Sequence, residues 1–147
     1  MSEIPLSKKI DLVGIGNAIV DIVTNIDDDF LKRNLLKKGS MNLINLENSD
    51  KILKECGITK QISGGSAANT VVSLANLGNN VEFIGRIKND KFGNFFSEDL
   101  KKSGALFNSE YVETKESSAH SIVLITPDAQ RTMCTYLGAS TEFEPNN

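Results

Sequence analysis

The chain has 147 residues, of which 39% are hydrophobic and 24% charged, with a formal net charge of -3. This length allows one substantial hydrophobic core, and therefore one domain. The acidic balance and the absence of long basic runs argue against a nucleic-acid-binding surface. No apolar run approaches the roughly 18 residues that suggest a membrane span, so we expect a cytoplasmic protein that binds neither nucleic acid nor membrane.

The cysteine and histidine content narrows the chemistry further. Cys56 and Cys134 are far apart and form no CxxC motif, so free thiols are expected. His120 is the only histidine, which argues against a zinc site built on histidines and against a Ser-His-Asp triad within this chain.

The first predicted strand spans residues 10–16 and ends in Gly14-Ile15-Gly16. Two glycines after a strand are typical of a dinucleotide-binding turn, but Ile19 stands where that fingerprint needs glycine or alanine. Asn17 and Asp21 follow as polar residues in an apolar setting, at the end of a strand where open α/β sheets place ligands. A turn-capping asparagine and a solvated aspartate are the alternative interpretation.

Three acidic residues, 27–29, precede a predicted helix over 30–38, with Asp27 or Asp28 as its N-cap and Gly39 as its end. An acidic triplet could bind a metal, but acidic side chains also favour a helix N-terminus, and we prefer the second explanation. The next expected elements are a strand over 41–46, a helix capped by Asn48-Ser49 that runs to Cys56 and ends at Gly57, and a strand over 60–63.

Gly64-Gly65 joins that strand to the clearest helix of the sequence, residues 66–77, which Gly78 closes. A glycine pair lets the main chain approach a ligand closely, and the free N–H groups of the helix start would face that ligand. Asn69, in the first turn, can donate and accept hydrogen bonds, which suits a polyhydroxylated ligand. A tight strand-to-helix turn without a ligand is the alternative.

The following segment completes an alternation of strands and helices. A strand over 81–85 precedes a helix whose apolar stripe contains three phenylalanines and which ends at Gly104. Strands that alternate with helices predict an α/β fold with a largely parallel sheet and helices on its faces.

After Gly104 the pattern becomes strand-rich. Strands are predicted over 107–113, 118–126 and 131–137, and a turn at 126–130 joins the last two. His120 falls on the second of these strands, where we expect a structural or exposed role.

Several of these motifs, in this order, resemble the N-terminal half of a ribokinase-like (PfkB-type) carbohydrate and nucleoside kinase. The resemblance covers residues 11–143, and segments 16–21 and 131–133 most resemble bacterial adenosine kinases within the family. The motifs are strand-Gly-x-Gly-Asn17-x-x-x-Asp21, Gly64-Gly65-x-Ala67-x-Asn69, Gly78, Gly85 with Asp90 and Gly93, Asp128-x-x-Arg131, and Tyr136-Leu137-Gly138-Ala139.

The resemblance implies the N-terminal part of a ribokinase-like α/β sandwich domain with a small β-sheet lid. The lid strands would lie near 18–26, 40–46, 118–126 and 132–137. In the family this lid closes over the sugar and often serves as a dimer surface, so a homodimer through the lid is expected. ATP and Mg²⁺ are the implied cofactors, and lid closure would shield the nucleotide from water.

The resemblance also implies roles for individual residues. Arg131 would lie near the transferred phosphoryl group or the substrate, where a guanidinium stabilises charge on phosphoryl oxygens. No metal ligand is expected in this chain. The substrate-binding residues would be Asn17, Asp21 and Asn69, which bind acceptor hydroxyls, and Gly64 and Gly65, whose backbone packs against the sugar ring.

One expected part is absent. The family's general base lies in a Gly-Ala-Gly-Asp-type motif of its C-terminal half, and the 147 residues contain neither this motif nor a Gly-Lys dipeptide of a P-loop. Residues 1–147 are therefore expected to be a truncated kinase domain: the acceptor-binding half of an ATP-dependent enzyme, inactive alone. Adenosine, converted to AMP, is the expected acceptor of the full-length protein. A ribokinase- or fructokinase-type sugar kinase, or a non-catalytic binding or dimerisation fragment, is the alternative.

Overall fold

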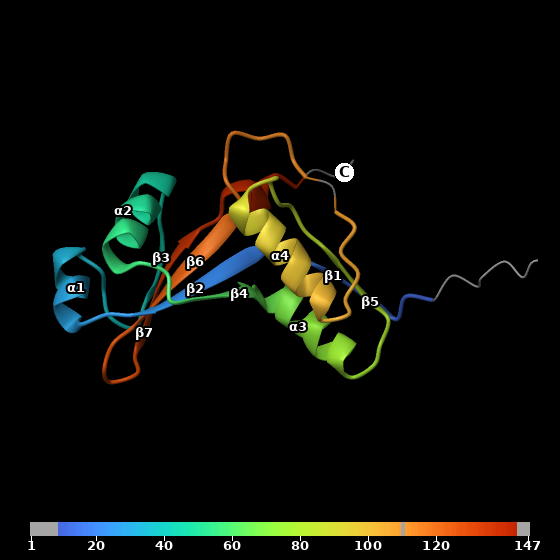
Figure 1. The fold of residues 1–147 in the computed structure, drawn as a ribbon, viewed down its shortest axis with the longest axis horizontal. Coiled ribbons are helices and arrows are strands. Elements are labelled where there is room, and N and C mark those ends of the chain that lie inside the picture. Colours follow the sequence, from blue (N-terminus) through green and yellow to red (C-terminus); the bar gives the residue numbers. More distant parts are fainter. Residues whose placement is uncertain (1–8, 110, 144–147) are drawn as a thin grey trace, which may run out of the picture.

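The computed structural model describes residues 9–109 and 111–143 and arranges their strands in two sheets (Figure 1). The smaller sheet pairs β1 (Leu12–Ile15) with β5 (Val81–Ile84) in parallel. The larger sheet has the strand order β3-β7-β6-β2-β4. Its strands are β2 (Ile19–Asn25), β3 (Met41–Leu43), β4 (Lys60–Gly64), β6 (Ala119–Ile125) and β7 (Arg131–Tyr136).

Four α-helices and one 3-10 helix complete the described fold. They are α1 (Asp28–Arg33), α2 (Leu46–Cys56), α3 (Ser66–Asn76), α4 (Lys91–Lys102) and η1 (Gly138–Thr141). Helix α3 packs against β1 and β5, and α4 crosses in front of the larger sheet (Figure 1).

The helices cover one face of the larger sheet and leave the other face open. Val20 and Ile22 of β2 pack in one core cluster with Phe96 and Leu100 of α4. A second cluster joins α1 and α2 to β6 and β7 through Phe30, Leu31, Ile52, Ile122, Leu124 and Cys134.

β1 and β5 pair in parallel, as the alternation of strands and helices predicted, whereas the larger sheet is mixed. β2 pairs in parallel with β6, and β3 with β7, whereas β2 with β4 and β6 with β7 are antiparallel. Because side chains alternate along a strand, Asp21 and Val23 of β2 lie on the uncovered face and are only half-buried. This face therefore retains room for another molecule or another part of a protein.

Two helix boundaries and two strands differ from the sequence-based expectation. One of these strands, β3, ends at Leu43 and not at residue 46, where α2 begins. Helix α1 is capped by Asp27 as expected but ends at Arg33, well before Gly39. There Leu35 adopts φ 55 in the position that usually holds glycine, while Leu36 donates to the carbonyl of Leu31 in a Schellman arrangement. The expected strand over 107–113 is reduced to an isolated bridge between Ile87 and Tyr111.

Helix α2 starts three residues earlier than predicted because Asn45, rather than Asn48 or Ser49, is its N-cap. The Asn45 side chain accepts a hydrogen bond from the backbone N–H of Asn48. Ser49 is fully buried and has a different partner, the ring of His120 on β6. Capping propensity alone could not separate these candidates, since all three are good N-caps.

His120 is buried, which decides between the structural and exposed roles expected for it. Its Nδ1 atom lies 3.1 Å from the carbonyl oxygen of Ser118, so Nδ1 carries the proton and Nε2 accepts from the Ser49 hydroxyl at 2.5 Å. The rings of Phe92 and Tyr136 pack on it at centroid distances of 4.6 and 5.4 Å. His120 therefore connects β6 to α2 through Ser49 and to α4 through Phe92.

This burial predicts a loss of stability in mild acid. Desolvation lowers the pKa of His120 below its usual 6.5, so the unfolded chain binds a proton that the folded chain resists. The stabilisation is complete above pH 6.5 and is lost as the pH falls below it, at up to about 1.4 kcal/mol per pH unit. Urea unfolding between pH 5 and 8 measures how the free energy of unfolding depends on pH. If His120→Gln showed the same pH dependence as the unaltered protein, His120 would not be its cause.

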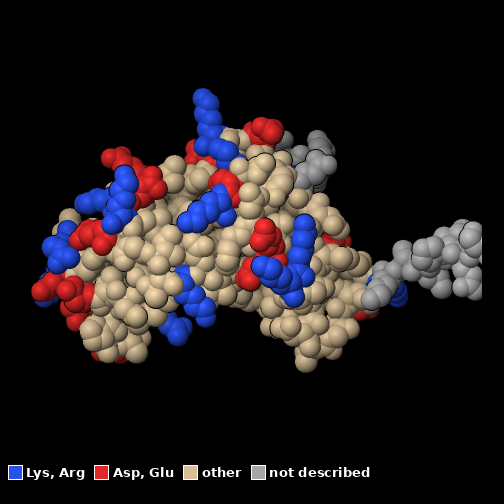
Figure 2. Space-filling model, viewed as in Figure 1, with Lys and Arg blue, Asp and Glu red and all other residues tan. Residues whose placement is uncertain are grey.

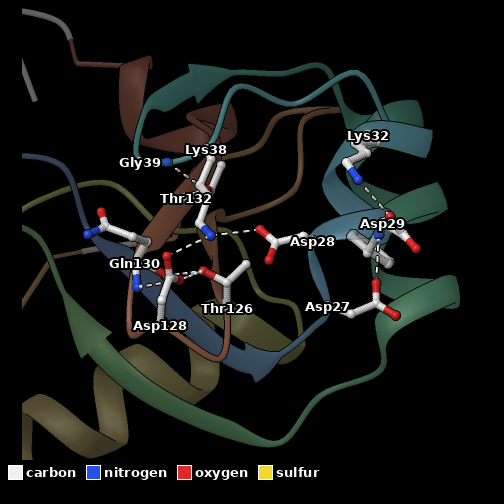
Figure 3. A network of polar contacts seen from close by, with 11 residues as sticks. Asp27, Asp28, Asp29, Lys32, Lys38, Gly39, Thr126, Asp128, Gln130 and Thr132 are labelled. Carbon is white, nitrogen blue, oxygen red and sulfur yellow. Dashed lines mark hydrogen bonds and ion pairs between the residues drawn. The ribbon is translucent and has the colours of Figure 1, made fainter.

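A polar network ties α1 to the turn between β6 and β7 (Figure 3). The Lys38 ammonium donates to Asp28 and to Asp128, at 2.7 Å in each case. Hydrogen bonds from Lys38, and then from Thr126, hold the pKa of the Asp128 carboxyl at about 2. Two residues of the acidic triplet therefore have structural roles: Asp27 caps helix α1, and Asp28 forms an ion pair with Lys38.

Candidate functional site

The glycines at the end of β1 serve helix packing. A Cβ atom built on Gly14 would lie 2.5 Å from Cγ2 of Val71, and one built on Gly16 would lie 2.8 Å from Cβ of Ala67. Both neighbours belong to α3. The two glycines therefore let α3 approach β1, which explains why they occur without the rest of a dinucleotide fingerprint.

The turn between β4 and α3 brings the glycine pair against the segment that follows β1. Gly65 has φ 95, in the region that L residues with side chains rarely adopt. A Cβ atom on Gly65 would also lie 2.8 Å from the carbonyl oxygen of Asn17. Only glycine satisfies both conditions, so this turn and the Asn17 backbone are held in contact.

Helix α3 begins at this turn without a side-chain cap. Gly65 is its N-cap and supplies no side-chain hydrogen bond. The N–H groups of the first turn are consequently not used by a capping side chain, and they carry the positive end of the helix dipole. Asn69 lies exposed on this first turn, with its own N–H bonded to the carbonyl of Gly65.

The Asp21 carboxylate lies over Gly64. On neighbouring strands Ile19 pairs with Gly64 and Asp21 pairs with Ile62. A Cβ atom on Gly64 would lie 2.7 Å from Cγ of Asp21 and closer still to one of its oxygens. The missing side chain of Gly64 thus makes the space that the carboxylate occupies.

Burial raises the pKa of Asp21 above its usual 3.8. The cause is desolvation, which penalises the charged form. A partly desolvated carboxylate destabilises the folded chain, because it has lost hydrogen bonds to water. It favours binding of a hydroxylated ligand, because the ligand hydroxyls can supply those hydrogen bonds. Asp21 is the third residue of β2, so it lies within a strand and not in the loop after β1.

Helix α4 holds the strand that leads into the glycine pair. The Asp99 carboxylate accepts a hydrogen bond of 2.9 Å from the backbone N–H of Ser63. β4 is an edge strand whose outward N–H groups have no strand partner. Asp99 therefore fixes the backbone one residue before Gly64, a role that nothing in its helical sequence context indicated.

A pocket of about 380 Å³ opens on the uncovered face of the larger sheet. Asp21 and Arg131 both line it, so the structure brings these two predicted residues to one place. Lys60 lines it as well and was not identified from the sequence. The remaining lining is apolar and comes from four strands: Val23, Ile62, Val123, Ile125 and Met133.

The predicted site residues thus form two adjoining groups. Gly64 contacts Asp21, and Gly65 contacts the backbone of Asn17, across the connection between β4 and α3. Arg131 joins Asp21 through the pocket. Asn69 is placed by α3, four residues after Gly65.

The described surface shows mixed charges in the view of Figure 2, and the described residues form no metal-binding cluster. Lysine, arginine and acidic side chains are interspersed on the face seen in Figure 2. Within residues 9–109 and 111–143, no three histidine, cysteine or acidic side chains gather as metal ligands would. Across the same residues, none of the helices has the length and apolar character needed to cross a bilayer.

The chain is similar to known kinases. A solved adenosine kinase from Sinorhizobium meliloti is 38% identical, with a TM-score of 0.85 over 94% of this chain and 42% of that chain. Adenosine kinase from Saccharomyces cerevisiae is 24% identical over 144 residues, 92% of this chain and 42% of that protein. A 5-dehydro-2-deoxygluconokinase from Clostridium perfringens is 44% identical over 54 residues, 37% of this chain and 16% of that protein.

These similarities agree with the fold expected from the sequence motifs, and the chain spans less than half the length of each of these relatives. Residues 32–147 match the family described as pfkB family carbohydrate kinase. The chain therefore belongs to the pfkB family of carbohydrate kinases and has the ribokinase-like α/β fold.

Proposed function

We propose that this chain is the acceptor-binding part of an ATP-dependent kinase that phosphorylates a hydroxyl group of a nucleoside or sugar. The observation that carries the proposal is the position of the Asp21 carboxylate. It lies over Gly64, on the open face of the sheet, in the pocket that also contains Arg131. A partly desolvated carboxylate that can accept two hydrogen bonds, beside an apolar floor, fits a hydroxylated ligand.

Each of the site residues makes a different contact with the acceptor. Asp21 accepts hydrogen bonds from ligand hydroxyls, and Asn17 and Asn69 add exposed amides that donate and accept. The Gly64-Gly65 backbone lets a sugar ring approach without a side chain in its way. Arg131 contacts phosphoryl oxygens, where its guanidinium stabilises their charge.

The described residues offer contacts for ATP but no cluster of ligands for Mg²⁺. ATP would supply the phosphoryl group, and Arg131 and Lys60 are cations of the pocket that fit its oxygens. Mg²⁺, which the family resemblance implies, finds no cluster of ligands among the described residues. The part played by this chain is therefore to bind and orient the acceptor and to close an apolar surface over it.

Adenosine is the acceptor that we favour, with a hexose, pentose or sugar acid as the alternative. The support for adenosine is the likeness to two adenosine kinases along nearly the whole chain, whereas two 5-dehydro-2-deoxygluconokinases match over 54 and 93 residues. The support for a sugar is a probable sugar kinase from Rhizobium etli, which is 36% identical over 93% of this chain. Calorimetric titration of the 147-residue protein with adenosine, ribose and fructose tests the choice. Tighter binding of either sugar than of adenosine would reverse it.

The isolated chain is expected to release no ADP above background from ATP and adenosine. It contains no Gly-Ala-Gly-Asp motif to take the proton from the attacking hydroxyl. A coupled ADP-release assay measures this directly. Sustained turnover by the purified protein would show that residues within this chain supply the base.

A non-catalytic dimer through the lid is the second candidate, and one observation favours it. Met41 and Leu43 of the edge strand β3 are 57% and 64% exposed, and an uncovered apolar edge strand is suited to pairing with another chain. Sedimentation velocity over a range of concentrations tests it. A monomer at all concentrations would exclude the dimer.

A further inference from the structure

Arg131 begins β7 directly after the turn of residues 126–130 that joins β6 to β7. Its backbone pairs with Ile125, the last residue of β6, and its side chain lines the pocket on the open face. Among the ion pairs formed by residues 9–109 and 111–143, Arg131 takes part in none. The position of its guanidinium therefore depends on the conformation of the turn that precedes it.

The turn contains a residue in an unfavourable backbone conformation. Ala129 has φ 63, in the left-handed region that residues with a Cβ atom disfavour. Two backbone hydrogen bonds close the turn, from the N–H of Ala129 to the carbonyl of Thr126 at 2.8 Å and from the N–H of Thr126 to the carbonyl of Gln130 at 3.1 Å. A conformation of this kind persists where surrounding contacts hold it.

Lys38 supplies such a contact from outside the turn (Figure 3). Its ammonium donates to the carboxylates of Asp28 on α1 and of Asp128 in the turn, at 2.7 Å in each case. The other carboxylate oxygen of Asp128 accepts from the Thr126 hydroxyl at 2.6 Å and from the N–H of Gln130 at 3.4 Å. Asp128 therefore connects both ends of the turn, through Lys38, to helix α1.

The next two residues of the chain hold the start of β7. The N–H of Gly39 donates to the hydroxyl of Thr132 at 2.9 Å. The carbonyl of Ser40 accepts from the N–H of Met133, also at 2.9 Å. The segment between α1 and β3 thus contacts the chain on both sides of Arg131.

We propose that Lys38 is a positioning residue that, by bridging Asp28 and Asp128, holds the β6–β7 turn in the conformation that directs Arg131 into the pocket. Neither Lys38 nor Asp128 lines the pocket, so both act through Arg131. The inference rests on the proposed function, in which Arg131 contacts phosphoryl oxygens. Without the bridge, the strained turn relaxes and Arg131 moves with it.

The first test measures the mobility of the turn by ¹⁵N relaxation of the backbone amides of residues 129–131. In the unaltered protein we expect order parameters of about 0.85, as in rigid backbone, and in Lys38→Met and Asp128→Asn values below about 0.6. Lys38→Arg keeps the charge and should keep the turn rigid. Amides of β2 should be unaffected in every variant, which reports that the fold is intact.

Lys37→Met is the matched control for the loss of a positive charge. Lys37 is the neighbour of Lys38, is exposed, and takes part in none of the ion pairs of the described residues. Its replacement removes the same charge and leaves the bridge to Asp128 in place. The order parameters of the turn should therefore stay at their original values.

The second test, calorimetric titration with ATP, separates position from charge. Lys38→Met removes a positive charge and Asp128→Asn a negative one, so a direct electrostatic effect would change the affinity for an anion in opposite directions. Loss of position weakens it in both. Arg131→Gln should lose about tenfold, as for one charge-assisted hydrogen bond, and the two bridge variants most of that. Adding Lys38→Met to Arg131→Gln should cause no further loss, because the two residues act through one contact.

Each outcome decides for or against the positioning role. Unchanged order parameters in Lys38→Met and Asp128→Asn would overturn it, and so would changes of ATP affinity in opposite directions. A loss of affinity confined to Arg131→Gln would overturn it and leave the proposed function standing. If Arg131→Gln bound ATP as the unaltered protein does, the proposed contact of Arg131 with phosphoryl oxygens would be wrong, and this inference with it.

Discussion

Asp21→Asn is expected to weaken binding of the acceptor by about 10- to 100-fold, the loss that follows when charge-assisted hydrogen bonds become neutral ones. The amide keeps the size of the carboxylate and therefore its place over Gly64. It offers one acceptor oxygen in place of two. Calorimetric titration with adenosine measures the loss.

The same variant should leave the free energy of unfolding unchanged or raise it. Burial raises the pKa of Asp21, so its ionised form opposes folding once the pH exceeds the usual 3.8. Removing the charge removes that cost, as is common where stability is given up for binding. A variant that lost stability together with affinity would show instead that Asp21 is structural.

Two further variants sharpen the result. Gly64→Ala should reproduce the loss of affinity, because the new methyl group takes the space of the Asp21 carboxylate. Asp50→Asn is the control, since Asp50 is exposed on α2, away from the pocket. It should bind adenosine as the unaltered protein does.

Gly65→Ala is expected to destabilise the chain by about 2–3 kcal/mol, the largest effect on stability that we predict. Part of the loss comes from the combination of φ 95 and ψ 138, which lies outside the left-handed helical region and costs a residue with a Cβ atom about 1–3 kcal/mol. The rest comes from the carbonyl oxygen of Asn17, 2.8 Å from the new Cβ atom, which belongs to the backbone and cannot rotate away. Urea unfolding monitored by circular dichroism measures the difference.

Gly78→Ala is the matched control for the first of these contributions. Gly78 has φ 89, close to that of Gly65, but a Cβ atom built on it would meet nothing within 4 Å. Its loss should therefore be about 1 kcal/mol, from the backbone alone. Equal losses in the two variants would mean that the contact between Gly65 and Asn17 does not constrain the fold.

Local signals were sufficient for the helices with clear ends. Helix α3 begins at the residue after Gly65 and ends close to Gly78, as periodicity and glycine punctuation indicated. They failed for α1, which ends at Arg33 because Leu35 adopts a left-handed conformation that the sequence gives no reason to expect. The strand predicted over 107–113 failed for a related reason, since strand propensity becomes a strand only where a partner is present.

Some residues of the candidate site could be identified from local sequence motifs, and others depend on contacts with residues far away in the sequence. Asn17, Asp21, Gly64, Gly65 and Asn69 were singled out from short motifs, since each motif records a local demand for a polar group or for the absence of a side chain. Lys60 and Asp99 were not, because their roles depend on residues 36 or more positions away, in Ser63–Asp99 and in the pocket shared with Arg131. No local pattern reports contacts of that range.

The sequence by itself determined the family, the alternation of helices and strands, and the residues that the pfkB motifs contain. The tertiary structure decided which of those residues meet: Asp21 lies over Gly64 because β2 and β4 pair antiparallel in that register. It also decided that one face of the larger sheet is open, since helices α1, α2 and α4 gather on the other. The physical reason is that burial and register are properties of strands brought together from distant parts of the chain, and short motifs do not encode that assembly.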